Sequence, residues 1–266
     1  DMKSGAYLAF YAFQHLVRSG QETPLPLTYL YVPEEEIGSP TSRQVIEDTA
    51  KKNKYVLVTE PAHNGLCCTA RKGVLHVDIK IHGRPAHAGS RHQDGRSALS
   101  ELAHQIVTLE SLTDYERGIT VNVGLASGGS FINVVPAEAE AKVCIRAPET
   151  EQLEALKEHV LALQPDDVDV KLEITAEINR PVFPRLEGTA ELFKHARDIC
   201  RKIGFDLEER HSGGGSDGNF TAALGIPTLD GLGADGHGHH TLDEYILFSS
   251  LKPRARMWVQ LLQTLT

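Results

Sequence analysis

The chain has 266 residues, of which 41% are hydrophobic and 24% are charged. This composition is typical of a soluble globular protein, and the length suffices for one large domain or two of average size. The formal net charge of −9 argues against nucleic acid or an anionic membrane as a partner, and no apolar run approaches the roughly 20 residues that span a bilayer.

The first part of the chain alternates helical segments with short apolar runs, which favours an α/β layer with a mostly parallel sheet. The run "LTYLYV" is almost continuously apolar, as in a strand that is buried on both faces, and "YVLVTE" has the same character. We expect a helix at 4–19, a strand at 27–32, a helix at 41–53 and a strand at 55–60.

Near Gly73 the hydrophobic pattern changes to a period of two. In "VLHVDIKIHG" the residues Leu75, Val77, Ile79 and Ile81 share one face, which is typical of a half-exposed strand. A helix at 95–112, strands at 119–125 and 138–145, a helix at 149–163 and a strand at 168–178 should follow. The order β-α-β-β-α-β is that of a ferredoxin-like α+β domain, which would fill about 73–180.

After a proline-rich joint at 180–184 the α/β rhythm returns. We expect a helix at 187–203, a strand at 206–210, a glycine loop at 212–220, a strand at 226–231 and a helix at 242–265, which Pro253 should kink or split. The prediction is therefore an α/β domain, formed by 1–72 and 181–266, that is interrupted by the inserted α+β domain.

The four cysteines contain no CxxC pair, and the adjacency of Cys67 and Cys68 disfavours a disulfide between them. Cys144 and Cys200 lie in apolar strand and helix patterns. We therefore expect reduced, mostly buried thiols and a cytoplasmic protein.

Acidic and histidine residues follow several of the expected strands. Glu34–Glu36 follow the strand at 27–32, Glu60 follows the next, and "ADGHGHH" follows the strand at 226–231. In an open α/β sheet the carboxyl ends of the strands form the ligand-binding rim, and gathered carboxylates favour a divalent cation such as zinc. Taken alone, each segment is more typical of a solvated loop than of a metal site, and the glycine loop matches no nucleotide-binding motif.

Seven segments stand in the order found in the M20 metallopeptidases, and the likeness is strongest to the carboxypeptidase G2 (glutamate carboxypeptidase) group. They are "DMKSG", "PEEEIGSP", "TEP", "GRPAHAGSRHQDGRSA", "SFINVVPAEAEAKVCIRAP", "GGGSDGNF" and "HTLDEY". The resemblance covers essentially the whole chain. It implies a three-layer zinc-peptidase domain carrying an inserted ferredoxin-like dimerisation, or lid, domain.

The resemblance also implies a role for each matching residue. Glu35 resembles the general base that takes a proton from the metal-bound water and later passes it to the leaving amine. His87 resembles a lid residue that polarises the scissile carbonyl across the dimer. The other positions resemble metal ligands at Asp1, Glu36, Glu60 and His240, carboxylate-binding lid residues at Asn133 and Arg146, and a substrate-pocket loop at Gly214, Gly215 and Ser216.

What the resemblance implies is a homodimer, joined through 73–180, with two Zn²⁺ ions per subunit; Co²⁺ and Mn²⁺ are alternatives. It would cleave an amide bond beside a free C-terminal carboxylate in a peptide or N-acyl amino acid, releasing an amino acid, with glutamate as the first candidate. The family's H-x-D metal-binding segment would precede Asp1, where this sequence starts. Two other hypotheses follow: a non-catalytic fragment that mainly retains the dimerisation module, or a related aminoacylase, dipeptidase or deacylase.

Overall fold

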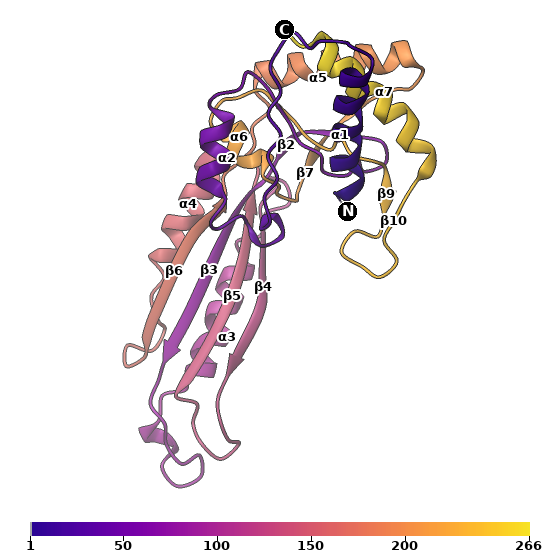
Figure 1. Cartoon of the computed structure of the whole chain (residues 1–266). Helices are drawn as coiled ribbons and strands as arrows, with labels where there is room; N and C mark the ends of the chain where they lie inside the picture. Colours follow the sequence, from indigo (N-terminus) through magenta and orange to yellow (C-terminus); the bar gives the residue numbers. More distant parts are fainter. Residues whose placement is uncertain (1) are drawn as a thin grey trace. The chain divides into compact units, whose positions relative to one another are not determined.

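The chain forms two units, each with its own hydrophobic core (Figure 1). The computed structural model describes residues 2–266. One unit, here called the split unit, contains 1–71 and 183–266, and the other, the inserted unit, contains 72–182. None of the helices in the described range is both long and apolar enough to cross a membrane.

The inserted unit is a four-stranded antiparallel sheet with two helices packed against it (Figure 1). The strand order is β4-β5-β3-β6, so β5 and β3 are central in the sheet and are flanked by β4 and β6, the second and the last strand of the unit in the sequence. The predicted ferredoxin-like order β-α-β-β-α-β is confirmed. Its elements are β3 Gly73–His82, α3 Ala98–Glu110, β4 Thr120–Gly128, β5 Glu138–Ala147, α4 Thr150–Leu161 and β6 Lys171–Arg180.

The alternation in β3 is the cause of this packing. Leu75, Val77, Ile79 and Ile81 are all buried, whereas the residues between them are exposed. Because side chains in a strand alternate between the faces of the sheet, one face becomes apolar and is covered by the helices. The helix α3 begins directly after Ser97, whose hydroxyl accepts a hydrogen bond from the backbone N–H of Ser100 at 3.2 Å.

The split unit is built from helices around short strand pairs. The pairs β1–β8 and β2–β7 are parallel, and β9–β10 is an antiparallel hairpin. Helices α1, α5 and α7 share the core of this unit. Its elements are α1 Lys3–Arg18, η1 Glu35–Ile37, α2 Arg43–Ala50, β1 Val56–Leu57, β2 Cys67–Arg71, α5 Glu187–Ile203, β7 Glu209–Ser212, α6 Gly218–Ala223, β8 Thr228–Leu229, β9 Gly236–His237, β10 Tyr245–Ile246 and α7 Phe248–Thr264.

Two expectations for the split unit are wrong. The segment 27–32 is not a strand: it pairs with no other segment in residues 2–266, and Leu30 and Tyr31 are 42% and 64% exposed. An apolar run becomes a strand only where a neighbouring strand accepts its hydrogen bonds. The last helix begins at Phe248 rather than at 242, because the hairpin β9–β10 occupies the residues before it, and α7 continues past Pro253 without being split.

Candidate active site

The three consecutive glutamates form a tight turn whose first member is structural. The carboxylate of Glu34 accepts hydrogen bonds from the backbone N–H of Thr41 at 2.9 Å and from its hydroxyl at 2.8 Å. These bonds, the backbone one first, lower the pKa of Glu34. Between the two residues, Gly38 takes a left-handed conformation with φ of 92°. Glu34 thereby closes the turn that presents Glu35 and Glu36.

Glu36 lies against His240, which comes from the loop between β9 and β10. The distance from Nε2 of His240 to Oε2 of Glu36 is 3.3 Å, and the two side chains are 69% and 64% exposed. About 200 residues of sequence separate them, so the fold alone brings them together. A carboxylate and an imidazole at this spacing are a pair of donors that suits a zinc-like cation.

Glu60 lies in a negatively charged environment at the end of β1. The pKa of Glu60 is raised to about 8, first by burial and then by the charges of Asp230, Glu35 and Glu36, while Arg71 opposes the shift. Asp230 follows β8, the parallel partner of β1, so two carboxylates meet at the same edge of the sheet. Such a group of carboxylates is stabilised by a bound cation.

A buried ion pair between Arg71 and Asp230 stabilises this edge of the sheet. Nε of Arg71 donates to the fully buried carboxylate of Asp230 at 2.7 Å, and the hydroxyl of Ser216 donates to the same oxygen at 2.5 Å. Nη1 of Arg71 also donates to the carbonyl of Gly214 at 3.0 Å. The glycine loop is therefore held in place by two hydrogen bonds, one to the carbonyl of Gly214 and one from the hydroxyl of Ser216. Gly215, between them, is half-buried.

A hydrogen bond joins the glutamate turn to the glycine loop. The hydroxyl of the buried residue Ser39 donates to Oδ1 of Asp217 at 2.6 Å. Reasoning from the sequence did not find the roles of Arg71, Asp230 or Ser39. The expected strand at 226–231 contains Asp230 and gave no sign of its role, and Arg71 and Asp230 are 159 residues apart in the sequence.

The four residues predicted as metal ligands are only partly brought together. Glu36 and His240 are in contact, and Glu60 lies close enough to Glu36 to respond to its charge. Asp1 lies outside the described residues. Across residues 2–266 no group of three or more His, Cys, Asp or Glu side chains has an arrangement that could hold a metal ion.

In the inserted unit, His87 and Asn133 lie side by side. The carbonyl of Asn133 accepts a hydrogen bond from the N–H of Ala88 at 3.0 Å. Nδ1 of the exposed His87 accepts hydrogen bonds from the N–H groups of Gly89 at 3.1 Å and Ser90 at 3.3 Å. Because Nδ1 acts as the acceptor, the proton of the neutral ring is on Nε2, which is free to donate to an external oxygen.

Arg146 lies at the other end of the same sheet. In the register of β3 and β5, Arg146 faces Val74, whereas the end near His87 is marked by the pair His82 and Glu138. Eight residues separate Glu138 from Arg146, which corresponds to about 26 Å along an extended strand. A single chain therefore does not bring Arg146 together with Asn133.

Comparisons with known proteins agree with this architecture. Residues 69–164 match the model of the M20 peptidase dimerisation domain. Over its whole length the chain is 29% identical to carboxypeptidase G2 from Pseudomonas sp. (strain RS-16). The chain is thus similar to M20 peptidases, and residues 69–164 match their dimerisation domain. It spans 65% of the length of that relative.

Solved structures share the fold of this chain. The aminopeptidase PepT from Bacillus cereus superposes with a TM-score of 0.79 at 24% identity, over 98% of this chain and 70% of PepT. YxeP from Bacillus subtilis, named as a dinuclear metal-binding peptidase of the M20 family, gives 0.69 at 17% identity, over 97% of this chain and 71% of YxeP. The predicted α/β fold with an inserted dimerisation domain is confirmed.

Proposed function

We propose that the protein hydrolyses an amide bond next to a free C-terminal carboxylate, in a metal-dependent reaction that releases an amino acid. The observation that carries this proposal is the contact of Glu36 with His240 at 3.3 Å, directly beside Glu35 and close enough to the half-buried Glu60 to act on it by charge. The homology to carboxypeptidase G2 and other M20 peptidases supports it.

The donor set of this edge fits divalent cations. In the proposal Glu36, His240, Glu60 and Asp1 would hold two divalent cations, with Zn²⁺ as the first candidate and Co²⁺ or Mn²⁺ as alternatives. Without a cation the raised pKa of Glu60 shows that its negative charge is poorly tolerated where it lies. A cation would lower the pKa of a bound water towards about 7 and polarise the amide carbonyl.

Glu35 is the proton carrier of the proposed reaction. It is the neighbour of the ligand Glu36 in the short helix η1, and successive residues there point in different directions. Glu35 accepts the proton of the attacking water and passes it to the nitrogen of the leaving amine. Glu34 is excluded from this role because its carboxylate is engaged by Thr41.

The inserted unit supplies groups for the substrate rather than for the metal. Nε2–H of His87 donates to the scissile carbonyl oxygen, and Arg146 with Asn133 binds the free carboxylate, for which the planar guanidinium is suited. Arg146 lies about 26 Å along the sheet from Glu138, which marks the end of the sheet near His87, so His87 and Arg146 serve one substrate only if they come from different chains. The proposal therefore includes a homodimer joined through 73–180, in agreement with the match to the dimerisation domain.

The substrate class follows from the relatives and from the carboxylate-binding groups. A peptide or N-acyl amino acid fits, and release of glutamate is the first choice because of the homology to carboxypeptidase G2. PepT is named as an aminopeptidase, so the same fold also serves other peptide substrates.

The substitution Glu35→Gln in the full-length, metal-loaded protein tests the proposal. Turnover of N-acyl glutamates should fall by about 10²–10⁴-fold, because the amide cannot carry the proton, while the metal content per chain stays the same. Glu22→Gln, at an exposed glutamate of the same unit, is the matched control. Undiminished turnover in Glu35→Gln contradicts the role of Glu35, and a metal-loaded wild type that hydrolyses no N-acyl amino acid contradicts the function.

A further inference from the structure

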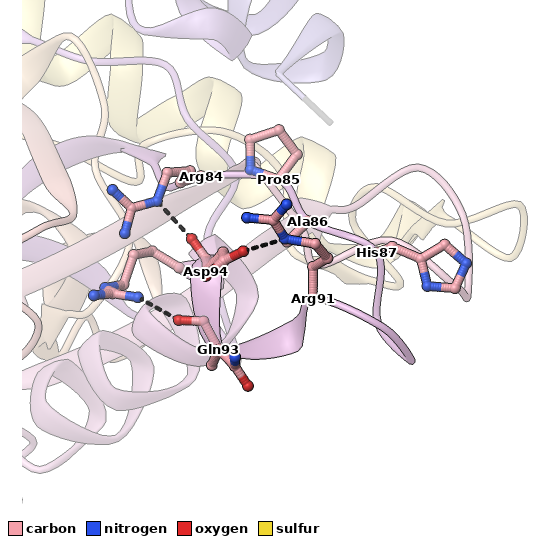
Figure 2. Close-up of a pocket in the computed structure, with 8 residues that line it drawn as sticks. Arg84, Pro85, Ala86, His87, Arg91, Gln93 and Asp94 are labelled. Carbon is pink, nitrogen blue, oxygen red and sulfur yellow. Dashed lines mark hydrogen bonds and ion pairs between the residues drawn. The ribbon is translucent and has the colours of Figure 1, made fainter.

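The segment that follows β3 in the inserted unit lines a hollow of about 640 Å³ that is open to solvent, and Figure 2 shows the residues that line it. This volume is within the roughly 300–1,000 Å³ that small-molecule sites have. The charged and polar residues that line it include Arg84, His87, Arg91, Asp94 and Arg96. The hollow therefore presents three guanidinium groups and one carboxylate beside the histidine of the proposed reaction.

One of the three arginines is already compensated. Arg96 binds Asp169 through Nε at 3.0 Å and Nη2 at 2.8 Å, and its Nε lies 3.3 Å from Asp167. Its Nη1 donates to the carbonyl of Gly95 at 2.8 Å. Asp167 and Asp169 do not line the hollow. Arg96 thus ties the loop to the segment before β6, and its charge is not available to a ligand.

The other two arginines both donate a hydrogen bond to Asp94, at different oxygens. Nε of Arg84 donates to the backbone carbonyl of Asp94 at 2.6 Å, and Nε of Arg91 donates to its carboxylate at 2.5 Å, as the dashed lines in Figure 2 show. Arg84 has a further, long contact of 3.7 Å to Asp169. Within residues 2–266, Asp94 is the only recorded partner of the Arg91 guanidinium, so both of its terminal nitrogens can donate.

Arg91 is also tied to His87 by the backbone. Its N–H donates to the carbonyl of His87 at 3.0 Å, so the two side chains extend from the ends of one turn. A ligand group held by Arg91 is therefore placed in a fixed relation to a carbonyl oxygen held by His87. The excess of positive charge in the lining selects an anion, and the fork of donors on each guanidinium suits a carboxylate.

We propose that Arg84 and Arg91 form a subsite for a second carboxylate of the substrate, in addition to the C-terminal carboxylate that flanks the scissile bond. This inference rests on the proposed function, which places His87 at the scissile carbonyl. The second carboxylate belongs either to the side chain of the leaving amino acid or to the acyl group. In both cases Arg91 determines the preference of the enzyme for acidic over neutral substrates.

The test uses the full-length, metal-loaded protein and substrate pairs that differ by one charge. N-acetyl-glutamate and N-acetyl-glutamine vary the leaving side chain, and N-succinyl-leucine and N-succinamoyl-leucine vary the acyl group. The readout is the ratio of kcat/KM for the dicarboxylate member to that for the monocarboxylate member. The pair with a ratio well above one in the wild type identifies the source of the carboxylate.

Arg91→Gln should lower that ratio by about tenfold or more, because a charged hydrogen bond to the second carboxylate is lost. Arg91→Lys should give an intermediate ratio, since lysine restores the charge without the fork of donors. Arg117→Gln, at an exposed arginine of the same unit outside the hollow, should leave the ratio unchanged. A ratio in Arg91→Gln equal to that of the wild type, or a wild type with no preference in either pair, overturns the inference.

Calorimetric titration with glutarate, which has two carboxylates, and with its monoamide, which has one, separates this inference from the proposed function. Arg91→Gln should weaken the binding of glutarate relative to that of the monoamide, and this measurement requires no turnover. If N-acyl amino acids are hydrolysed but neither readout depends on Arg91, only the subsite is wrong. If glutarate binding depends on Arg91 but no substrate is cleaved, the proposed function is wrong while the anion site stands.

Discussion

The four cysteines, all free, differ in their chemistry. Burial raises the pKa of Cys67, raises that of Cys68 to about 11 and raises that of Cys200 to about 12. Cys144 in β5 is half-buried, and burial alone would raise its pKa as well. Hydrogen bonds from His76 and Arg146 outweigh that effect, so the pKa of Cys144 lies below its usual value of 9.0.

Cys144 should therefore be the one thiol that reacts rapidly with a disulfide reagent in the native protein. Its lowered pKa increases the thiolate fraction below pH 9, so the rate should reach half its maximum at a pH below that value, whereas the buried thiols stay protonated and inaccessible. Stopped-flow titration of native protein measures this, and Cys144→Ser should remove the fast phase. A fast phase that survives in Cys144→Ser contradicts the assignment.

Among the elements, strands far apart in the sequence are joined by buried polar contacts. Arg71 at the end of β2 binds Asp230, which follows β8, and reaches the loop after β7. The guanidinium is nearly buried and the carboxylate completely so. Burial disfavours the charged form of Arg71, yet the charge of Asp230 outweighs burial and raises the pKa of Arg71 above its usual value.

Replacing Arg71 by Met should lower the free energy of unfolding by about 3–5 kcal/mol, because the charge of Asp230 is left buried without a partner. Arg201→Met is the control: its contacts to Asp198 and Asp206 are 4.0 Å long and exposed, so the cost should be below about 1 kcal/mol. Urea denaturation followed by circular dichroism measures both. An equal decrease in the free energy of unfolding for the two variants would show that the buried Arg71–Asp230 pair stabilises the fold no more than an exposed ion pair does.

For the whole molecule, the sheet of the inserted unit separates groups that the proposed reaction needs together. His87 and Asn133 lie beyond one end of the sheet, and Arg146 lies at the other end. A two-fold dimer brings each end of one chain to a different site, so every complete site would contain residues of both subunits.

Mixing two inactive variants tests this arrangement. In a mixed dimer of Glu35→Gln and His87→Ala, one site has its own Glu35 and receives His87 from the other subunit. After subunit exchange, activity should return to about a quarter of the wild-type value, because half of the dimers are mixed and each has one complete site. The double variant exchanged with His87→Ala is the control and should remain inactive. Mixed dimers without activity would place His87 in the site of its own chain.

Local patterns in the sequence were sufficient to predict the fold of the inserted unit. The alternation of Leu75, Val77, Ile79 and Ile81 defines a buried face whatever the rest of the chain does, and the β-α-β-β-α-β order follows from neighbouring segments. The same reasoning was wrong for 27–32, since an apolar run does not show whether a partner strand lies beside it.

The residues of the candidate site were named from motifs, but their relations were decided by the tertiary structure. The sequence identified Glu35, Glu36 and His240 as candidates, whereas only the fold brings Glu36 within 3.3 Å of His240. It also gave no sign of the partnership between Arg71 and Asp230. Hydrophobic periodicity is a local property that can be read from a short stretch of sequence. The free energy of a charged side chain, in contrast, depends on which residues, remote in the sequence, take the place of its hydration water in the folded protein.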